Sequence, residues 1–340
     1  MFRRTVVQPT YLCALLALAA ASGLAQTLPP ENVPPGGDFG STPAPNSVVE
    51  KIPADVIIVK GAQPHASDRV TPLPEDGAVA KGVYRNSYFG MTWKLPDGWS
   101  EPFGGPPPSD TGLYVLSNVV PEAKYKGPSK GTVMISAQDI FFAPMPARDA
   151  KELIAYRREH LEPYYELENA PSEMTLAGRP FARFDYQSRV AGIHWIVLAT
   201  EVRCHAVQFV FSSRDPKLNE ALVADLNEKM TFADDEKWPR CVADYATRAN
   251  ILERVDPVLK DRRFNPIPVR VVIDRKGKVK HVHILSAFGD QAQIITDALM
   301  GWRFKPYTVN GEAVEIETGL NFGAPPLRQR VVTARNAHTD

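Results

Sequence analysis

The chain has 340 residues, with 39 Lys and Arg against 39 Asp and Glu, so its formal net charge is zero. This length suffices for two ordinary domains and their linkers. Binding to nucleic acid through its phosphates requires a basic face, and the sequence contains no block rich in Lys and Arg, so that class of function is excluded. The same charge balance gives no reason to expect a polybasic membrane-binding patch.

The first 25 residues have the composition of an export signal. Arg3 and Arg4 form a positive start, residues 11–21 are uncharged and rich in Leu and Ala, and residues 23–25 have the small-x-small pattern of a cleavage site. An apolar run of roughly fifteen residues is shorter than the roughly twenty that cross a bilayer. We therefore expect export to the periplasm through a cleavable signal peptide. The alternative is an inner-membrane anchor, with the rest of the chain facing the periplasm.

Two cysteines follow this predicted signal, Cys204 and Cys241. An even number of cysteines in an oxidising compartment is compatible with a disulfide, which would contribute about 3 to 4 kcal/mol in the chain-entropy model. Two free thiols are the alternative. The sequence has no Cys-x-x-Cys pair and no Cys/His cluster, so we expect no structural zinc site and no cofactor.

Residues 26–80 are rich in Pro, Gly, Ser and Asn. Such a composition buries too little apolar surface to offset the entropy of ordering, so we expect a disordered spacer there. Within it, residues 56–59 are expected to form one isolated strand. Order is expected to begin near Gly82, and residues 324–340 are expected to be a disordered tail.

Residues 81–235 have the pattern of an α+β domain. Apolar residues at helical spacing predict helices at 147–161, with Asp149 near its start, and at 217–230, which follows Asp215 and Pro216. Alternation of large apolar residues predicts the strands. The expected strands are 88–96, 112–119, 131–142, 179–189, 193–202 and 205–212.

Three short sequence motifs in this segment resemble motifs of the PsbP-like fold family. They are Asn86-Ser87-Tyr88-Phe89-Gly90-Met91, Leu95-Pro96-Asp97-Gly98-Trp99 and Met230-Thr231-Phe232. The resemblance implies an α/β sandwich. Because that family gathers binding and assembly factors, it also implies an alternative function, as a structural or assembly factor of the envelope that acts through this domain.

Residues 245–323 predict a smaller domain with the order strand, strand, helix, strand. Residues 269–273 and 279–285 flank a turn with Gly277, which is typical of a β-hairpin. Residues 291–302 have one apolar face, with Asp290 as the expected N-cap and Trp302 as the expected core anchor. Phe304 and Tyr307 begin a further strand, and Asn310-Gly311 is a strong tight-turn signal.

These residues resemble the TonB C-terminal domain family. The sequence motifs of the family are matched by Ile273-Asp274-Arg275-Lys276-Gly277-Lys278-Val279, Leu285-Ser286, Trp302-Arg303-Phe304-Lys305-Pro306 and Asn310-Gly311. The resemblance implies a non-enzymatic, transport-accessory or energy-transduction-related protein. Its partner would be an extended peptide segment of an outer-membrane or periplasmic protein, such as a TonB box, and self-association is the alternative.

A small antiparallel sheet leaves an edge with unpaired N–H and C=O groups, which can accept a partner strand by β-augmentation. The resemblance implies that this edge is the last strand. Glu315 and Glu317 are expected on its polar face, where they would keep the edge soluble. The candidate strand-binding residues are Ala313, Val314, Glu315, Ile316, Glu317, Thr318, Leu320 and Phe322.

The common local signatures of catalysis are absent from the sequence, which has no Gly-x-Ser-x-Gly elbow, P-loop or His-Glu-x-x-His. We therefore expect no enzymatic activity. His281 and His283 share one face of a strand and would suit a metal, but two solvated histidines on a sheet surface are the preferred interpretation.

Overall fold

The computed structural model describes residues 68 and 70–323, apart from short gaps at 103–104, 106–107, 125–129, 146, 148, 234–237, 260–265 and 288. The predictions for the signal peptide at 1–25, for residues 56–59 and for the tail at 324–340 lie outside the described residues. All described residues belong to one compact unit, residues 54–325. Within the described ranges, every helix is too short or too polar to cross a bilayer.

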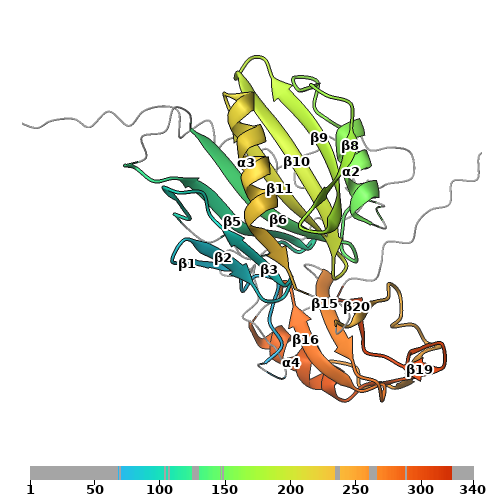
Figure 1. The fold of residues 1–340 in the computed structure, drawn as a ribbon. Coiled ribbons are helices and arrows are strands. Elements are labelled where there is room, and N and C mark those ends of the chain that lie inside the picture. The colour runs from blue at the N-terminus through green and yellow to red at the C-terminus, as the bar shows by residue number, and fades with distance from the viewer. Residues whose placement is uncertain are drawn as a thin grey trace, which may run out of the picture. The chain divides into compact units, whose positions relative to one another are not determined.

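An eight-stranded antiparallel sheet dominates the first part of the described chain (Figure 1). Its order is β4-β5-β6-β11-β10-β9-β7, and β8 pairs with β9 beside β7. Tight turns join β9 to β10 and β10 to β11, so neighbours in sequence pair in the sheet. The strands are β4 Trp99–Ser100, β5 Leu113–Pro121, β6 Gly131–Asp139, β7 Glu166–Leu167, β8 Ser172–Leu176, β9 Arg179–Ser188, β10 Ile193–Val202 and β11 His205–Ser213.

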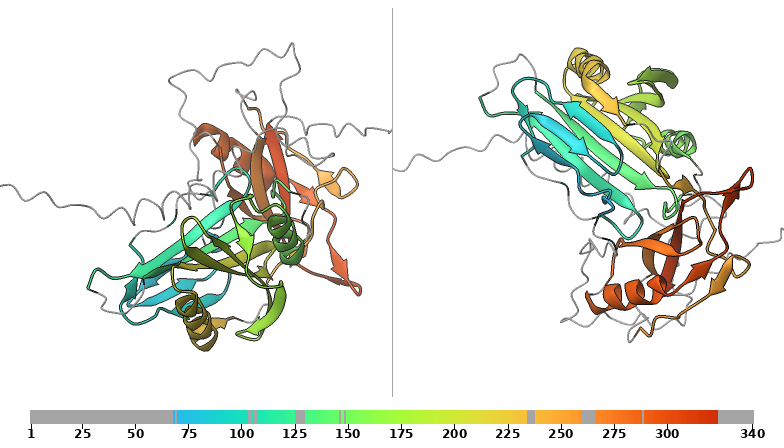
Figure 2. Two further views of the ribbon diagram at one scale, coloured as in Figure 1. Left: turned by 90° about the horizontal axis from the view of Figure 1, so that it is seen from above. Right: turned by 60° about the horizontal axis from the view of Figure 1, so that its bottom comes forward.

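The two faces of this sheet carry different layers, because side chains alternate along each strand. Leu198 of β10 belongs to the large first hydrophobic core, which also contains Leu226 of helix α3, Pro216–Lys229. Its neighbour Val197 points to the other face and packs with Ile154 of helix α2, Ala150–Glu159. Figure 2 shows the two helices on opposite sides of the sheet.

Helix α3 begins one residue before its predicted start at 217, and α2 begins at Ala150, three residues after its predicted start at 147. Asp149 caps α2 by accepting a hydrogen bond from Glu152 N at 2.8 Å, and Asp215 caps α3 by accepting one from Lys217 N at 3.0 Å. Such caps satisfy backbone donors that the first turn leaves unpaired. Pro216 stands in the first turn of α3, where its missing N–H costs nothing.

A four-stranded sheet covers the α3 side of the first core. Its order is β1-β2-β3-β12, with β1 Ala78–Ala80, β2 Val83–Asn86, β3 Met91–Lys94 and β12 Met230–Phe232. The expectation that order begins near Gly82 is wrong. Leu73 is already buried, and Asn86 Nδ2 donates to the Pro74 carbonyl at 2.8 Å, so local hydrogen bonds and one apolar anchor order the last part of the predicted spacer.

The second hydrophobic core lies under a smaller sheet with the order β13-β20-β15-β16. Strand, strand, helix and strand follow one another as the sequence predicts: β15 Pro266–Ile273, β16 Val279–Ile284, α4 Gly289–Met300 and β20 Ile316–Gly323. Strand β13, Arg240–Cys241, also belongs to this sheet, although it is not one of the four predicted elements. Two small ladders complete it, β14 Ile251–Glu253 with β17 Arg303–Phe304, and β18 Thr308–Val309 with β19 Glu312–Ala313.

Helix α4 differs slightly from its prediction. It begins at Gly289, so Asp290 stands in its first turn rather than at the N-cap, and it ends at Met300, before Trp302. Trp302 is still a core anchor, since it is buried in the second core and its Nε1 donates to the Val255 carbonyl at 2.7 Å. The described chain is therefore an α+β structure with two large hydrophobic cores and two small clusters around α2. The predicted limits at 235 and 245 remain predictions about how the chain divides.

Candidate functional site

Strand β20 is not a fully open edge, which corrects the central expectation from the sequence. It pairs antiparallel with β15 along its whole length, and parallel with β13 at Ile316 and Glu317. Two backbone hydrogen bonds hold β13 there: Arg240 N donates to Glu315 O at 2.9 Å, and Val242 N donates to Glu317 O at 3.0 Å. At these positions the chain itself already occupies the place of a partner strand.

The rest of the side opposite β15, which we call the β20 outer edge, is more open. The chain that follows β13 still contacts β20 at Tyr245, whose N–H donates to the Thr318 hydroxyl at 3.3 Å. Beyond it, no strand in the described ranges pairs with residues 320–323 on this side. Unpaired N–H and C=O groups of this kind are the template that an added strand needs.

The candidate strand-binding residues fall into three groups. Ala313 belongs to β19 and pairs with Thr308, so the strand is not continuous from 313 to 322. Val314 donates its N–H to the Tyr307 carbonyl at 3.0 Å, which also directs it away from β20. The other six residues, Glu315, Ile316, Glu317, Thr318, Leu320 and Phe322, lie in β20 or directly before it.

The two glutamates expected on a solvated face behave differently. Glu315 is partly exposed and pairs with Lys280 at 3.2 Å. Glu317 is buried, with 3% of its surface exposed, and accepts a hydrogen bond from the Tyr88 hydroxyl at 2.8 Å. The expectation that Glu317 keeps the edge soluble is therefore wrong, because the second face of this sheet is covered by residues of the first core.

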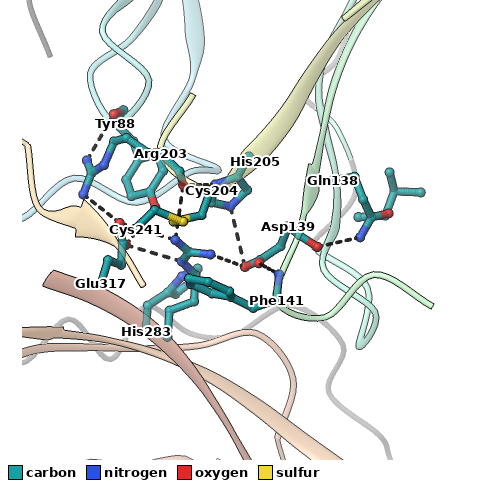
Figure 3. A network of polar contacts seen from close by, with 12 residues as sticks. Tyr88, Gln138, Asp139, Phe141, Arg203, Cys204, His205, Cys241, His283 and Glu317 are labelled. Atoms are coloured by element: carbon teal, nitrogen blue, oxygen red, sulfur yellow. Dashed lines mark hydrogen bonds and ion pairs between the residues drawn. A yellow bond between two sulfur atoms is a disulfide. The ribbon is translucent and has the colours of Figure 1, made fainter. Parts of the chain in front are cut away.

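Glu317 is one member of a buried polar network that joins the two cores (Figure 3). Arg270 of β15 contacts Glu317 at 3.3 Å and donates to Asp139 of β6 at 2.6 Å. Arg203, which follows β10, contacts Glu317 at 3.4 Å and donates to the Tyr88 carbonyl at 3.1 Å. Two arginines and two carboxylates thus balance in charge, as buried ionised groups require.

Electrostatics acts differently on the two carboxylates of this network, since burial outweighs the charge of Arg270 and raises the pKa of Asp139. Burial disfavours the carboxylate of Glu317, but the positive charges of Arg270 and Arg203 outweigh it and hold its pKa far below the ordinary value. Burial also lowers the pKa of His205, whose Nδ1 lies 2.7 Å from the Arg203 carbonyl, so this imidazole stays neutral. With a neutral His205 and a charged Glu317, the network acts as a structural contact between the first and the second core.

The disulfide alternative of the sequence is present: Cys204 and Cys241 are joined. Cys204 lies buried in the turn between β10 and β11, and Cys241 lies in β13. The bond therefore attaches the linker strand to the first core at the point where that strand pairs with β20 (Figure 3). A pocket of about 630 Å³ lies beside it, lined by both cysteines, Trp238 and four arginines among others.

The two histidines of β16 are not solvated, contrary to the sequence expectation. His281 and His283 are both buried, on the sheet face opposite α4. His281 Nδ1 lies 3.3 Å from Asp68 and His283 Nε2 lies 2.9 Å from Glu75, so an N-terminal stretch that was expected to be disordered covers them. Within the described ranges, no group of three or more His, Cys, Asp or Glu side chains is placed to hold a metal.

The remaining motif residues build the hairpin and its support. Asp274 accepts hydrogen bonds from Lys276 N and Lys278 N, both at 2.8 Å, which closes the turn. Gly277 has φ +76°, and its carbonyl accepts from Phe304 N at 2.8 Å, so the turn packs against the buried Phe304. Asn310 and Gly311 form the tight turn between β18 and β19, whereas Pro306 is exposed.

Sequence reasoning missed the linker strand and the arginine that joins the cores. Residues 240–242 show no alternation long enough to predict a strand, and only Cys241, through its pairing with Cys204, gave a signal that this segment is held in place. Arg270 stands in a run of β-branched residues, where a charged side chain signals either an exposed face or a buried partner. Nothing in the local pattern distinguishes those two cases.

A scan against protein-family models and a search of the curated proteins each found no match. Among solved structures, the chain is similar to cyanobacterial PsbP (CyanoP) of Synechocystis sp. PCC 6803, with 16% identity and a TM-score of 0.30 over 46% of this chain and 96% of that one. It is also similar to LpqN of Mycobacterium tuberculosis, described as involved in cell envelope biogenesis, with 13% identity and a TM-score of 0.26 over 42% and 83%.

With TM-scores this low, neither likeness assigns a fold family to residues 81–235. None of the comparisons supports the resemblance of residues 251–323 to the TonB C-terminal family, which stays a hypothesis. The geometry of the β20 outer edge therefore carries the functional argument.

Proposed function

We propose that this chain is a non-enzymatic protein of the bacterial periplasm that binds an extended segment of another envelope protein by β-augmentation on the β20 outer edge. The composition of residues 1–25 supports export, and a disulfide is typical of an oxidising compartment. A role as a transport accessory follows from the TonB-type resemblance and belongs to the same proposal.

One observation carries the proposal: the side of β20 opposite β15 already holds an added strand at its first residues, Ile316 and Glu317. Arg240 and Val242 donate their N–H groups to the carbonyls of Glu315, directly before β20, and Glu317 within it, as an incoming peptide would. These two carbonyls therefore have the orientation that strand addition requires. The residues next to this site in the same strand, 320–323, have no strand on that side within the described ranges.

The sheet beneath the edge is rigid enough to serve as a template. Strand β20 is fixed on its other side by β15 over eight paired positions, Ile316 to Gly323. Ile316 is buried in the second core, and Leu320 and Phe322 pack against that core, which prevents a register slip of one residue. A partner strand would find fixed main-chain groups, and its affinity would come mainly from backbone hydrogen bonds.

Backbone resonances of residues 316–323 provide the direct test. The isotopically labelled chain would be titrated with random extended peptides selected on the immobilised protein, and chemical shifts would be followed by NMR. Binding by β-augmentation predicts shifts confined to β20 and the linker at 240–245. It also predicts loss of binding when alternate peptide N–H groups are N-methylated, because these methyl groups remove the ladder donors.

The matched control is the same peptide methylated at the other set of N–H groups, which face away from the sheet and should leave binding unchanged. Shifts that map to the eight-stranded sheet, with β20 unaffected, would contradict the proposal and favour the alternative of an assembly factor that acts through residues 81–235.

A further inference from the structure

The disulfide connects two segments of different exposure. Cys204 is 1% exposed, in a turn where it and Arg203 both have positive φ. Cys241 is exposed and stands in the middle of the linker segment, which we define as residues 238–245. One sulfur of the bond is therefore fixed in the first core, and the other belongs to a strand at the surface.

The linker segment is anchored at both ends. Trp238 packs against the first core, and the Tyr245 hydroxyl donates to the Lys305 carbonyl at 2.7 Å in the second. Between these anchors, β13 pairs with β20, Arg240 N and Val242 N donate to the carbonyls of Glu315 and Glu317, and the Val242 side chain packs against the second core. A strand of two residues buries little surface and has few hydrogen bonds to offset the entropy of ordering, so the covalent bond at Cys241 contributes to keeping β13 in place.

The pocket of about 630 Å³ gives access to this bond. Its lining includes both cysteines together with Arg179, Arg203, Arg240 and Arg275. Its two acidic side chains are engaged elsewhere, since Glu315 pairs with Lys280 and Glu201 accepts a hydrogen bond from the Ala150 backbone. The lining holds four arginines against two glutamates, and although Arg203 also contacts Glu317, the remaining excess of positive charge favours the thiolate forms that leave and attack in thiol–disulfide exchange.

We propose that Cys204–Cys241 is a redox-modification site for a dithiol reductant, and that its reduction releases β13 and completes the β20 outer edge for a partner strand. This inference rests on the proposed function for the binding step, but not for the release of β13. In the oxidised protein the linker segment competes with the partner for Glu315 O and Glu317 O. In the reduced protein the edge extends from 316 to 323.

The exchange proceeds in two balanced steps. A thiolate of the reductant attacks the sulfur of Cys241, which is the exposed residue of the pair, the S–S bond breaks, and Cys204 leaves as a thiolate that takes up a proton. The second thiol of the reductant then loses its proton and attacks the reductant's first sulfur, which is bonded to Cys241 in the mixed disulfide. Cys241 leaves and takes up a proton to become a thiol. The dithiol is oxidised to a disulfide by two electrons, and the protein gains two thiols.

Hydrogen exchange of the full chain tests the release without any ligand. We expect the amides of Arg240 and Val242 to exchange about tenfold faster or more after treatment with dithiothreitol, because they lose their acceptors on β20. The amides of β15 should keep their protection, which shows that the second core stays folded. Unchanged protection of Arg240 and Val242 after complete reduction would overturn the proposal.

A synthetic peptide that copies residues 238–244 and carries Cys241→Ser tests the competition. We expect it to bind the reduced chain about tenfold more tightly than the oxidised chain, since β13 in the oxidised chain competes at a high effective concentration. The double variant Cys204→Ser/Cys241→Ser should bind as the reduced chain does, with or without dithiothreitol. Equal binding to the oxidised and reduced chains would overturn redox control of the edge.

Val242→Pro separates this inference from the proposed function. This variant keeps the disulfide but removes one of the two donors, so it should bind the peptide without reduction. If Val242→Pro binds the peptide and the reduced wild type does not, the edge accepts strands and redox control is wrong. If neither binds while hydrogen exchange still reports release, the proposed strand-binding function is wrong and the redox release stands.

Discussion

Arg270 Nη1 donates to Asp139 Oδ2 across 2.6 Å, and 1% or less of either side chain is exposed. Arg270 belongs to the second core and Asp139 to the end of β6, so a charged pair fastens the two cores together. A buried pair of this kind contributes little compared with an apolar contact of the same volume, but it is costly to break. The network around Arg270 is therefore sensitive to the loss of any single member.

Glu317→Gln should destabilise the chain by about 3 to 5 kcal/mol, because it leaves Arg270 and Arg203 buried with one carboxylate between them. Glu315→Gln is the matched control. It removes only a partly exposed pair with Lys280, which should cost about 1 kcal/mol or less. Urea unfolding followed by tryptophan fluorescence measures both. Equal losses in the free energy of unfolding would contradict the prediction, because removing a charge from the buried network would then cost no more than removing one at the surface.

The stability that His205 contributes should fall as the pH drops below about 6.5, the unfolded value for histidine, whereas Asp139, whose pKa burial raises, acts in the opposite direction. Burial, followed by the positive charge of Arg270, lowers the pKa of His205 in the folded state, so the unfolded chain binds the extra proton first. The stability present above pH 6.5 is then lost as the pH falls towards the folded pKa, at up to about 1.4 kcal/mol per pH unit for each such group. His281 contributes in the same direction, since burial and His283 lower its pKa.

The variant His205→Gln tests this assignment through a slope rather than through total stability. Unfolding free energies measured between pH 7.5 and 5.5 should depend less steeply on pH than in the wild type, with a residual slope from His281. An unchanged slope in His205→Gln would show that His205 does not titrate differently on unfolding.

Gly277→Ala and Gly311→Ala form a second matched pair. Both glycines have positive φ, +76° and +85°, so each alanine should cost about 1 to 2 kcal/mol in backbone strain. A Cβ at Gly277 would also lie 1.9 Å from the Phe304 carbonyl oxygen, whereas nothing lies within 4 Å of a Cβ at Gly311. We expect Gly277→Ala to lose at least about 2 kcal/mol more in thermal or urea unfolding. A similar loss in both variants would mean that the hairpin moves away from Phe304 freely.

The elements that local sequence patterns specify were predicted well. The hairpin around Asp274 and Gly277, the Asn310-Gly311 turn and the caps at Asp149 and Asp215 each depend on residues close in the chain, and the structure has all of them. Alternation in β20 also predicted which side chains face the second core, with Ile316 buried there. Periodicity identifies two faces of a strand, and a helix or turn follows from the residues next to it.

What covers the second face could not be predicted in the same way. Glu317, His281 and His283 have the polar character of an exposed face, but residues of the first core and the segment at 68–75 bury them. The pairing of Arg240 with Ile316 joins positions far apart in sequence, and only a contact between distant segments defines it. Local propensity carries no information about such contacts, so the occupied edge of β20 was not foreseen.

The position of the disulfide in the chain has a consequence for how the molecule assembles. Both cysteines precede Ile316 in the sequence and are synthesised first, so oxidation can proceed while the strand that β13 will join is still missing. The C-terminal residues, which are synthesised last, then pair with β13, a strand that the Cys204–Cys241 disulfide already attaches to the preceding part of the chain. The order of emergence thus places β13 beside the first residues of β20 as soon as that strand forms, whereas no described strand covers residues 320–323 on the same side.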